Sequence, residues 1–435
     1  MEEHDIQTIR TQTEWMKWME GKELKLFCFL SMIALFATAF LLETPMGLAE
    51  GISEIIFSRD ALITDYFELV GFGPAFLNAA LVFAVGMILI TAYRIPFTGI
   101  TIAALFINAG FGLWGKNLCN IWPMIFGTML YARLHRTRFQ RYIYTALFGS
   151  CLAPLVTELV VLLPFGHGTN MVCAVSAGIL IGFVLPPLSM HTASMHMGYN
   201  LFNVGFSAGI LAFAIVCILR SFGMVSNSVM IWRYGIQTEL AVGIFLYFLA
   251  TFFFGLFLCR GKIGLLKKIW RHPGRAVADF ILMDGPGAAL MNMGMVGMVC
   301  EAYIVLVRGD LSGPVVGAIF AVFGFAAFGV HIKNYLPVLA GVYLSTFLTV
   351  YDPHTPGIQL AAIFSAALAP VAGQFGIVPG VIAGFLNAVI VVCTGELYGG
   401  LNLYNSGFGA GWVAIVVVPL TESFMKRFTQ RKRTD

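Results

Sequence analysis

The chain has 435 residues, of which 59% are hydrophobic and only 11% are charged. Soluble globular domains carry about 25% charged residues, so this composition excludes a soluble domain and predicts a polytopic membrane protein. The net charge of +4 comes from short loops and a basic tail, which bears on membrane orientation and gives no reason to expect nucleic acid binding. The eight cysteines include no Cys-x-x-Cys pair, so we expect neither a metal site nor a redox role.

After a polar segment at residues 1–24, apolar runs follow one another along the chain. The first run, 26–42, lacks a small-residue cleavage signature and is interpreted as a retained span rather than a signal peptide. Further spans are predicted at 73–93, 142–163, 171–187 and 201–220. Two shorter runs, 98–114 and 119–132, predict a helical hairpin that can re-enter the membrane, because the second is shorter than the ~20 residues of a perpendicular span. Two full crossings are the alternative, which would give fourteen crossings in all.

The second half of the chain repeats the first. Residues 73–78 align with 287–292, an offset of 287 − 73 = 214, and the same offset pairs Asn120 with Asn334. Near the end of each half stands a twelve-residue motif, at 198–209 and 400–411, in which eight positions are identical. The sequence therefore predicts two membrane repeats, 25–220 and 238–421, followed by a basic tail at 422–435.

Loop charges predict that the second repeat is inserted upside down. Each half contains an odd number of crossings, whether the hairpin counts as zero or two, and an odd number inverts the copy that follows. The four arginines of 133–141 correspond to 351–356, which holds no Lys or Arg, and the acidic connector 43–68 corresponds to the basic stretch 260–275. Positively charged loops stay in the cytoplasm. We therefore expect a cell-membrane protein with equivalent loops on opposite sides and both termini in the cytoplasm.

The repeated motif holds the candidate binding residues. In each copy two asparagines stand three apart at the start of an apolar run, which places them on one helix face. The uncharged segment 189–197, rich in Met and His, is predicted to fold back into the protein as a loop, and so is its counterpart 394–399. Broken helices of this kind aim backbone N–H groups at a solute, although a tight hairpin whose polar groups satisfy one another is the alternative. The candidate solute-binding residues are Asn200, Asn203, Asn402, Asn405, Asn78, Asn292, Tyr199, Phe202 and Tyr404.

Ionisable side chains at membrane depth are candidates for coupling to protons or sodium. Glu158 stands in mid-span and its repeat counterpart is the neutral Gln374, a pattern that suits a single proton or cation site. For Glu301 and Lys116 we favour interfacial side chains that snorkel. Two histidines without a third ligand do not predict a metal site. The further coupling candidates are Glu396, His191, His196 and Lys333.

The chain resembles an uncharacterised family of bacterial multi-spanning membrane proteins, known as a domain of unknown function. This likeness covers essentially the whole chain, including His191-Thr-Ala-Ser-Met-His196 and the motif at 198–209, and it implies relatives but no activity. Phe76-Leu-Asn78 and Gly198-Tyr199-Asn200 are also similar to elements of the urea channel family, whose members are duplicated and contain short re-entrant helices. Positions 79 and 80 depart from that pattern, since both are alanine.

These observations predict an all-α membrane protein with two inverted-topology repeats, each of about five transmembrane helices plus a short hairpin. The expected function is transport of a small polar solute through a site between the repeats, coupled to protons or a cation. A passive urea-type channel and a membrane-embedded enzyme or scaffold are the alternatives. No Walker loop, dinucleotide motif, zincin helix or nucleophile elbow occurs, so we expect no cofactor and no enzyme activity. Besides the lipid bilayer, the expected partner is a second copy of the chain in a homo-oligomer.

Overall fold

The computed structural model describes residues 21–60, 63–225 and 230–434. Most of the predicted segment 1–24 lies outside the described residues, as do the side chains of Glu396 and of 427–434.

Almost all of the described first half is helical. Its helices are α2 (Lys22–Leu42), α3 (Pro45–Phe57), α4 (Tyr66–Leu69), α5 (Phe72–Ala92), α6 (Gly99–Phe111), α7 (Trp122–Leu134), α8 (Ile143–Gly149), α9 (Ala153–Leu162), α10 (His167–Met195) and α11 (Asn203–Ser221). The 3-10 turns η1 (Phe139–Tyr142) and η2 (Ser150–Leu152) join α8 and α9 into one helical run.

The second half repeats this order. Its helices are α12 (Thr238–Leu258), α13 (Leu266–Ile269), α14 (Phe280–Asp284), α15 (Pro286–Leu306), α16 (Gly313–Phe325), α17 (Ile332–Leu348), α18 (Pro356–Phe364), α19 (Ala369–Phe375), α20 (Ile377–Leu397) and α21 (Asn405–Thr434), with the 3-10 turns η3 (Ile263–Leu265) and η4 (Ser365–Leu368). A two-residue parallel pair, β1 (Ile63–Thr64) and β2 (Met230–Ile231), ties the first connector to the link between the halves.

Ten helical runs of the described chain are long and apolar enough to cross a membrane, five in each half. The 13-residue helices α6 and α16 are too short to span the membrane, and they pack on each other, whereas α7 packs on α10 and α17 on α20. The protein is therefore a two-repeat, multi-pass helical membrane protein, and the prediction of five spans in each half is confirmed, while the re-entrant hairpin stays a prediction.

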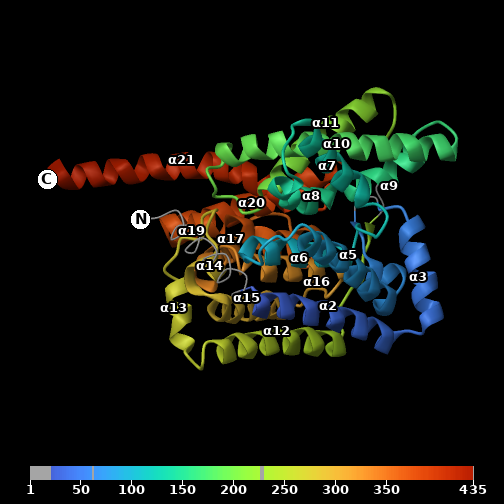
Figure 1. Cartoon of the computed structure of the whole chain (residues 1–435). Helices are drawn as coiled ribbons and strands as arrows, with labels where there is room; N and C mark the ends of the chain where they lie inside the picture. Colours follow the sequence, from blue (N-terminus) through green and yellow to red (C-terminus); the bar gives the residue numbers. More distant parts are fainter. Residues whose placement is uncertain (1–20, 61–62, 226–229, 435) are drawn as a thin grey trace, which may run out of the picture.

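The two short helices α6 and α16, which are equivalent in the repeats, cross at the centre of the molecule (Figure 1). They run antiparallel, because Gly110 meets Gly317 at one end of the contact while Ala103 meets Gly324 at the other. A Cβ atom on Gly317 would lie 2.3 Å from the carbonyl oxygen of Gly110, and one on Gly110 would lie 2.2 Å from that of Gly317. The backbones can approach this closely only because both positions are glycine.

A carboxylate from each repeat fixes the first turn of the other repeat's short helix. Asp65 accepts hydrogen bonds from Phe67 N at the start of α4 and from Gly313 N at the start of α16. Asp279, its equivalent at the 214-residue offset, binds Ile281 N of α14 and Gly99 N of α6. Each carboxylate satisfies N–H groups that have no partner within their own helix and favours the positive end of the helix dipole.

Equivalent residues also meet at the edge of the molecule. Helices α2 and α12 lie along one edge, on the far side of α6 and α16 from α10 and α11 (Figure 1). Ser31 and Tyr247 each occupy the tenth position of their 21-residue helix, and their hydroxyl oxygens are 2.8 Å apart. Equivalent residues of the two repeats therefore contact each other both where α6 crosses α16 and where α2 meets α12, as expected around a local two-fold axis.

One local prediction is wrong. Segment 189–197 is not a loop, because α10 continues to Met195 through Pro186 and Pro187, and α20 likewise continues to Leu397. Among the polar side chains that ended the apolar run, Ser189, Thr192 and His196 are buried inside the protein. The span predicted at 142–163 is confirmed as the helical run Phe139–Leu162, which changes to 3-10 geometry before Pro154, as α18–α19 does before Pro370.

We expect Gly317→Ala to lower the free energy of unfolding by about 1–3 kcal/mol, because the new methyl group forces α6 and α16 apart. The thermal midpoint of the detergent-solubilised protein measures this. Gly243→Ala in α12 is the matched control, since its Cβ would meet open space. Equal midpoints for the two variants would contradict the close crossing.

Candidate functional site

The inner asparagines of the two motifs tie the repeats together. Asn200 Nδ2 donates to Gly407 O at 2.9 Å, and Asn402 Nδ2 donates to Gly205 O at 3.3 Å. Each side-chain oxygen accepts the backbone N–H two residues on, from Phe202 in one copy and Tyr404 in the other. Both amides are buried, so these bonds satisfy backbone groups that the two helix breaks leave open.

The outer asparagines turn back onto the preceding helix. Asn203 Nδ2 donates to Ser189 O at 2.8 Å, while its oxygen accepts from Thr192 Oγ1 at 2.9 Å and from His196 Nε2 at 2.8 Å. Asn405 repeats this pattern with Val391 O, Thr394 Oγ1 and Tyr398 OH. Both outer asparagines are only half-buried, and one amide hydrogen of each is not used in these bonds.

His196 is held as a neutral ring. Its Nε2 donates to Asn203, and its Nδ1 accepts the N–H of Asn200 at 3.3 Å, so a proton on Nδ1 would break the second bond. His191 lies on the exposed side of α10. The structure therefore does not bring the two histidines into one site, and the described residues contain no group of three His, Cys, Asp or Glu able to hold a metal ion.

Two cavities flank the motifs. Cavity A, of about 520 Å³, is lined by the end of α10, the first motif and α8, with Asn200, Asn203 and Tyr144 among its residues. Cavity B, of about 180 Å³, is lined by the end of α20, the second motif and α18, with Asn402 and Asn405 among its residues. The linings are equivalent, since Met190, Ala193 and Asn203 of cavity A correspond to Val392, Gly395 and Asn405 of cavity B at an offset of 202.

Six aromatic rings form a plug between the cavities. At its centre Phe202 and Tyr404, equivalent residues of the two motifs, stack with their centroids 4.7 Å apart. Four rings of the plug line cavity A, and Phe364, which packs on both Phe202 and Tyr404, lines cavity B. Repeat symmetry relates the plug residues in pairs, which are Phe111 with Phe325, Phe148 with Phe364, and Phe202 with Tyr404.

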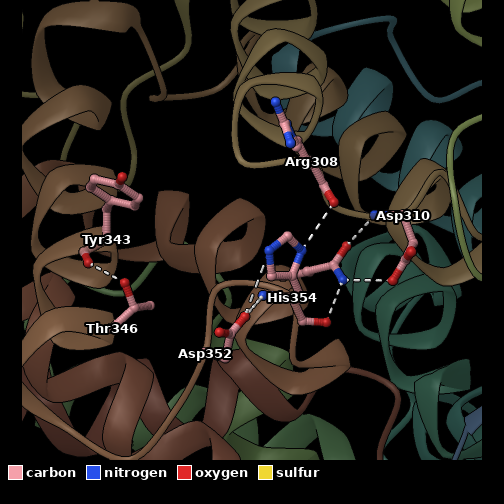
Figure 2. Close-up of polar contacts among 7 residues, drawn as sticks. Arg308, Asp310, Tyr343, Thr346, Asp352 and His354 are labelled. Atoms are coloured by element: carbon pink, nitrogen blue, oxygen red, sulfur yellow. Dashed lines mark hydrogen bonds and ion pairs between the residues drawn. The ribbon is translucent and has the colours of Figure 1, made fainter.

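Polar contacts shape the mouth of cavity B. His354, at the end of the 351–356 loop, binds Arg308 O through Nδ1 at 3.0 Å, and its backbone N–H donates to Asp352 at 2.7 Å (Figure 2). Asp310 accepts hydrogen bonds from Trp232 Nε1 and from the buried side chain of Gln359 in α18. The start of α18 is thereby fixed against the loop that follows α15.

Glu158 is buried in an ion pair that the sequence did not reveal. Arg59 binds both of its carboxylate oxygens, through Nε at 2.8 Å and through Nη2 at 2.6 Å. Beside this pair, the buried Asp60 accepts hydrogen bonds from three neutral donors, Tyr66 OH, Asn120 Nδ2 and Thr157 Oγ1. The second repeat has Gly274 and Gln374 at the positions of Asp60 and Glu158, so the acidic cluster exists in one repeat only.

The other ionisable candidates are placed as follows. Lys333 is exposed at the start of α17, and the side chain of Glu396 lies outside the described residues. Snorkelling is wrong for both Lys116 and Glu301, which are buried. Lys116 Nζ instead donates to Asn108 Oδ1 at 2.9 Å and to Ser150 Oγ at 2.8 Å, since these groups give the ammonium acceptors inside the protein.

Three predicted solute-binding residues line neither cavity. Asn78 donates to Gly112 O and Lys116 O, and Asn292 makes the equivalent bonds to Ala326 O and Val330 O, so each ties a long helix to a short one. The ring of Tyr199 stacks on Phe375 and under the Arg275 guanidinium, 4.6 Å from its centroid. A role for these residues in solute binding stays a prediction.

With this geometry in place, comparison with known proteins gives one match. A family model described as a protein of unknown function, DUF1576, matches residues 44–221 and 260–423. The chain belongs to the DUF1576 family. No curated protein and no solved structure matches it. Each matched region of this DUF1576 protein contains one copy of the asparagine motif. The resemblance to the urea channel family stays a prediction.

The Asp60 cluster of this DUF1576 protein predicts a pH-dependent stability. Burial disfavours the charged carboxylate and, with a smaller contribution from the charge of Glu158, raises the pKa of Asp60 to about 7, against the opposing effect of its three hydrogen bonds. The folded state therefore binds this proton more tightly than the unfolded state, whose Asp has a pKa of about 3.9. The contribution of Asp60 to the free energy of unfolding should fall as pH rises from about 4 to about 7.

We expect Asp60→Asn to remove this part of the pH dependence, measured as the difference in thermal midpoint between pH 5 and pH 8 in detergent. Glu54→Gln, at an exposed position of the same connector, is the control and should keep the wild-type difference in thermal midpoint between the two pH values. If Asp60→Asn also keeps the wild-type difference, Asp60 is not the group responsible for it.

Proposed function

We propose that this protein is a membrane transporter of a small polar solute whose path runs through cavity A, the aromatic plug and cavity B. The carrying observation is that the two cavities are lined by equivalent residues of the two repeats and are separated by three contacting rings, of which Phe202 and Tyr404 line cavity A and Phe364 lines cavity B. A site between two related halves, beside broken helices, is the arrangement expected of repeat-built transporters. Asn203 and Asn405, which line the cavities and keep an amide hydrogen available, are the proposed solute contacts.

The repeats are proposed to lie in the bilayer with opposite orientation. The antiparallel contact of the equivalent helices α6 and α16 supports this, and so do the loop charges. Cavity A is lined by residues that follow the basic stretch 260–275, such as Ala276, whereas cavity B is lined by Thr355 of the loop 351–356, which holds no Lys or Arg. In this proposal cavity A faces the cytoplasm and cavity B faces the opposite side of a bacterial inner membrane.

The plug favours a carrier over a passive channel. A channel needs a continuous opening, whereas the contacting rings of Phe202, Tyr404 and Phe364 close the route between the cavities. Solute passage in this proposal requires the rings to separate, as in alternating access between two related halves. Asp60 and Glu158 form an acidic cluster that is present in one repeat only. This cluster is the proposed site at which binding of protons or cations promotes the separation of the rings.

A labelling experiment tests the path. Met190 of cavity A and Val392 of cavity B are equivalent positions, so we replace each with Cys in a variant whose native cysteines have been removed. We expect a membrane-impermeant thiol reagent to label Met190→Cys from the cytoplasmic side and Val392→Cys from the opposite side. Labelling of both positions from one side would overturn the proposed path and orientation.

Glu158→Gln tests the coupling. The substitution reproduces the Gln374 of the other repeat while removing the charge that Arg59 neutralises. We expect solute uptake into proteoliposomes to lose its dependence on an imposed proton or sodium gradient while downhill exchange continues. Unchanged gradient dependence would remove Glu158 from the coupling mechanism.

A further inference from the structure

The described residues that line the two cavities include no Asp, Glu, Lys or Arg. Among them, the titratable residues of cavity A are His196, which is held neutral, and the tyrosines Tyr144 and Tyr404. A charged solute would lose its hydration here without gaining a counter-charge, which costs far more than transfer of a neutral polar molecule.

The buried Lys116 lies behind the plug rather than in a cavity. Its ammonium is 5.0 Å from the centroid of Phe111, and that ring is 5.6 Å from the ring of Tyr404. Its hydrogen bonds to Asn108 and Ser150 hold the amino group behind Phe111, and burial lowers the pKa of Lys116 to about 7, so this side chain supplies no fixed counter-charge for an anion in either cavity.

Two polar atoms beside Phe111 are buried without any hydrogen-bond partner in the structure. They are the hydroxyl of Tyr404, which lines cavity A, and Nε1 of Trp114, which lines cavity B. Both residues are almost fully buried, at 1% and 3% exposure. The equivalent residues in the other repeat are Phe202 for Tyr404 and Phe328 for Trp114. In each case the other repeat therefore carries an apolar ring at the equivalent position.

An unpaired buried polar group costs about 1–3 kcal/mol, so two of them on residues that contact the same ring, Phe111, require an explanation. An indole N–H can only donate, and a phenol hydroxyl can donate or accept. A molecule that satisfies both groups in turn must therefore present a hydrogen-bond acceptor, such as the oxygen of an amide, a urea or an alcohol.

We propose that the transported solute is a small uncharged molecule with a carbonyl or hydroxyl oxygen, and that Tyr404 and Trp114 select it by hydrogen bonding as it passes the plug. This inference rests on the proposed transport function. The two residues act in succession, since one lines each cavity and both contact Phe111.

Two pairs of probes with nearly the same shape and different charge test the solute class in proteoliposomes. Radiolabelled urea is compared with guanidinium, and acetamide with acetate, at pH 7. We expect saturable uptake of urea or acetamide and little uptake of their charged counterparts. Equal or faster uptake of guanidinium or acetate would overturn the inference while leaving transport itself established.

Tyr404→Phe and Trp114→Phe test the two selecting residues. Each change introduces the ring that the other repeat carries and removes one hydrogen bond, so we expect kcat/KM for the uncharged probe to fall about 2–10-fold. Because the hydroxyl of Tyr404 is unpaired in the structure, the thermal midpoint of Tyr404→Phe should not fall, whereas Trp114→Phe also removes buried ring volume and should lower the midpoint. Tyr303→Phe is the matched control, since its hydroxyl is also buried and unpartnered but lines neither cavity, and its uptake should equal wild type.

Wild-type uptake by both Phe variants would overturn the selecting role. If wild type takes up none of the four probes, the inferred solute class is wrong, and the labelling of Met190→Cys and Val392→Cys then decides separately whether the path exists.

Discussion

The fold depends on satisfying backbone groups where two helices break inside the protein. Residues 196–202 and 398–404 separate long helices and are largely buried, so their backbone groups need hydrogen-bond partners inside the protein. Asn200 and Asn402 solve this reciprocally, because each donates to a carbonyl of the other repeat and accepts an N–H of its own turn. The two breaks are consequently held face to face, and the aromatic plug between the cavities is a direct result.

The contacts that pack the two repeats on each other are symmetric, whereas several ionisable and polar residues occur in one repeat only. Glycine contacts, carboxylate caps and asparagine ties all occur twice, as expected when two copies must pack on each other. Several ionisable and polar groups occur once: the residue equivalent to Asp60 is Gly274, the one equivalent to Lys116 is Val330, and the one equivalent to Tyr404 is Phe202. The packing of the two repeats therefore does not require these groups in both copies.

Particular residues show how far prediction from sequence reached. The sequence identified the motif asparagines, but it did not show that Asn200 binds the other repeat while Asn203 binds the preceding helix. These roles follow only from the groups that pack around each side chain. The plug was missed although the 214-residue offset already paired Phe111 with Phe325. Its rings come from four separate helices and two turns, so only their packing shows that they meet. Glu158 looked like a lone acid because Arg59 is 99 residues away in the chain.

The sequence by itself determined the membrane class, the duplication and the number of spans, because hydropathy and repeat spacing are local or periodic properties of the chain. The tertiary structure alone decided which polar groups are neutralised, which face a cavity and which lie unpaired. These depend on distances between segments far apart in sequence, such as Asn402 to Gly205 or Asp65 to Gly313. In a protein with this few charges, each such contact determines whether a buried polar side chain is paired inside the fold or left without a partner.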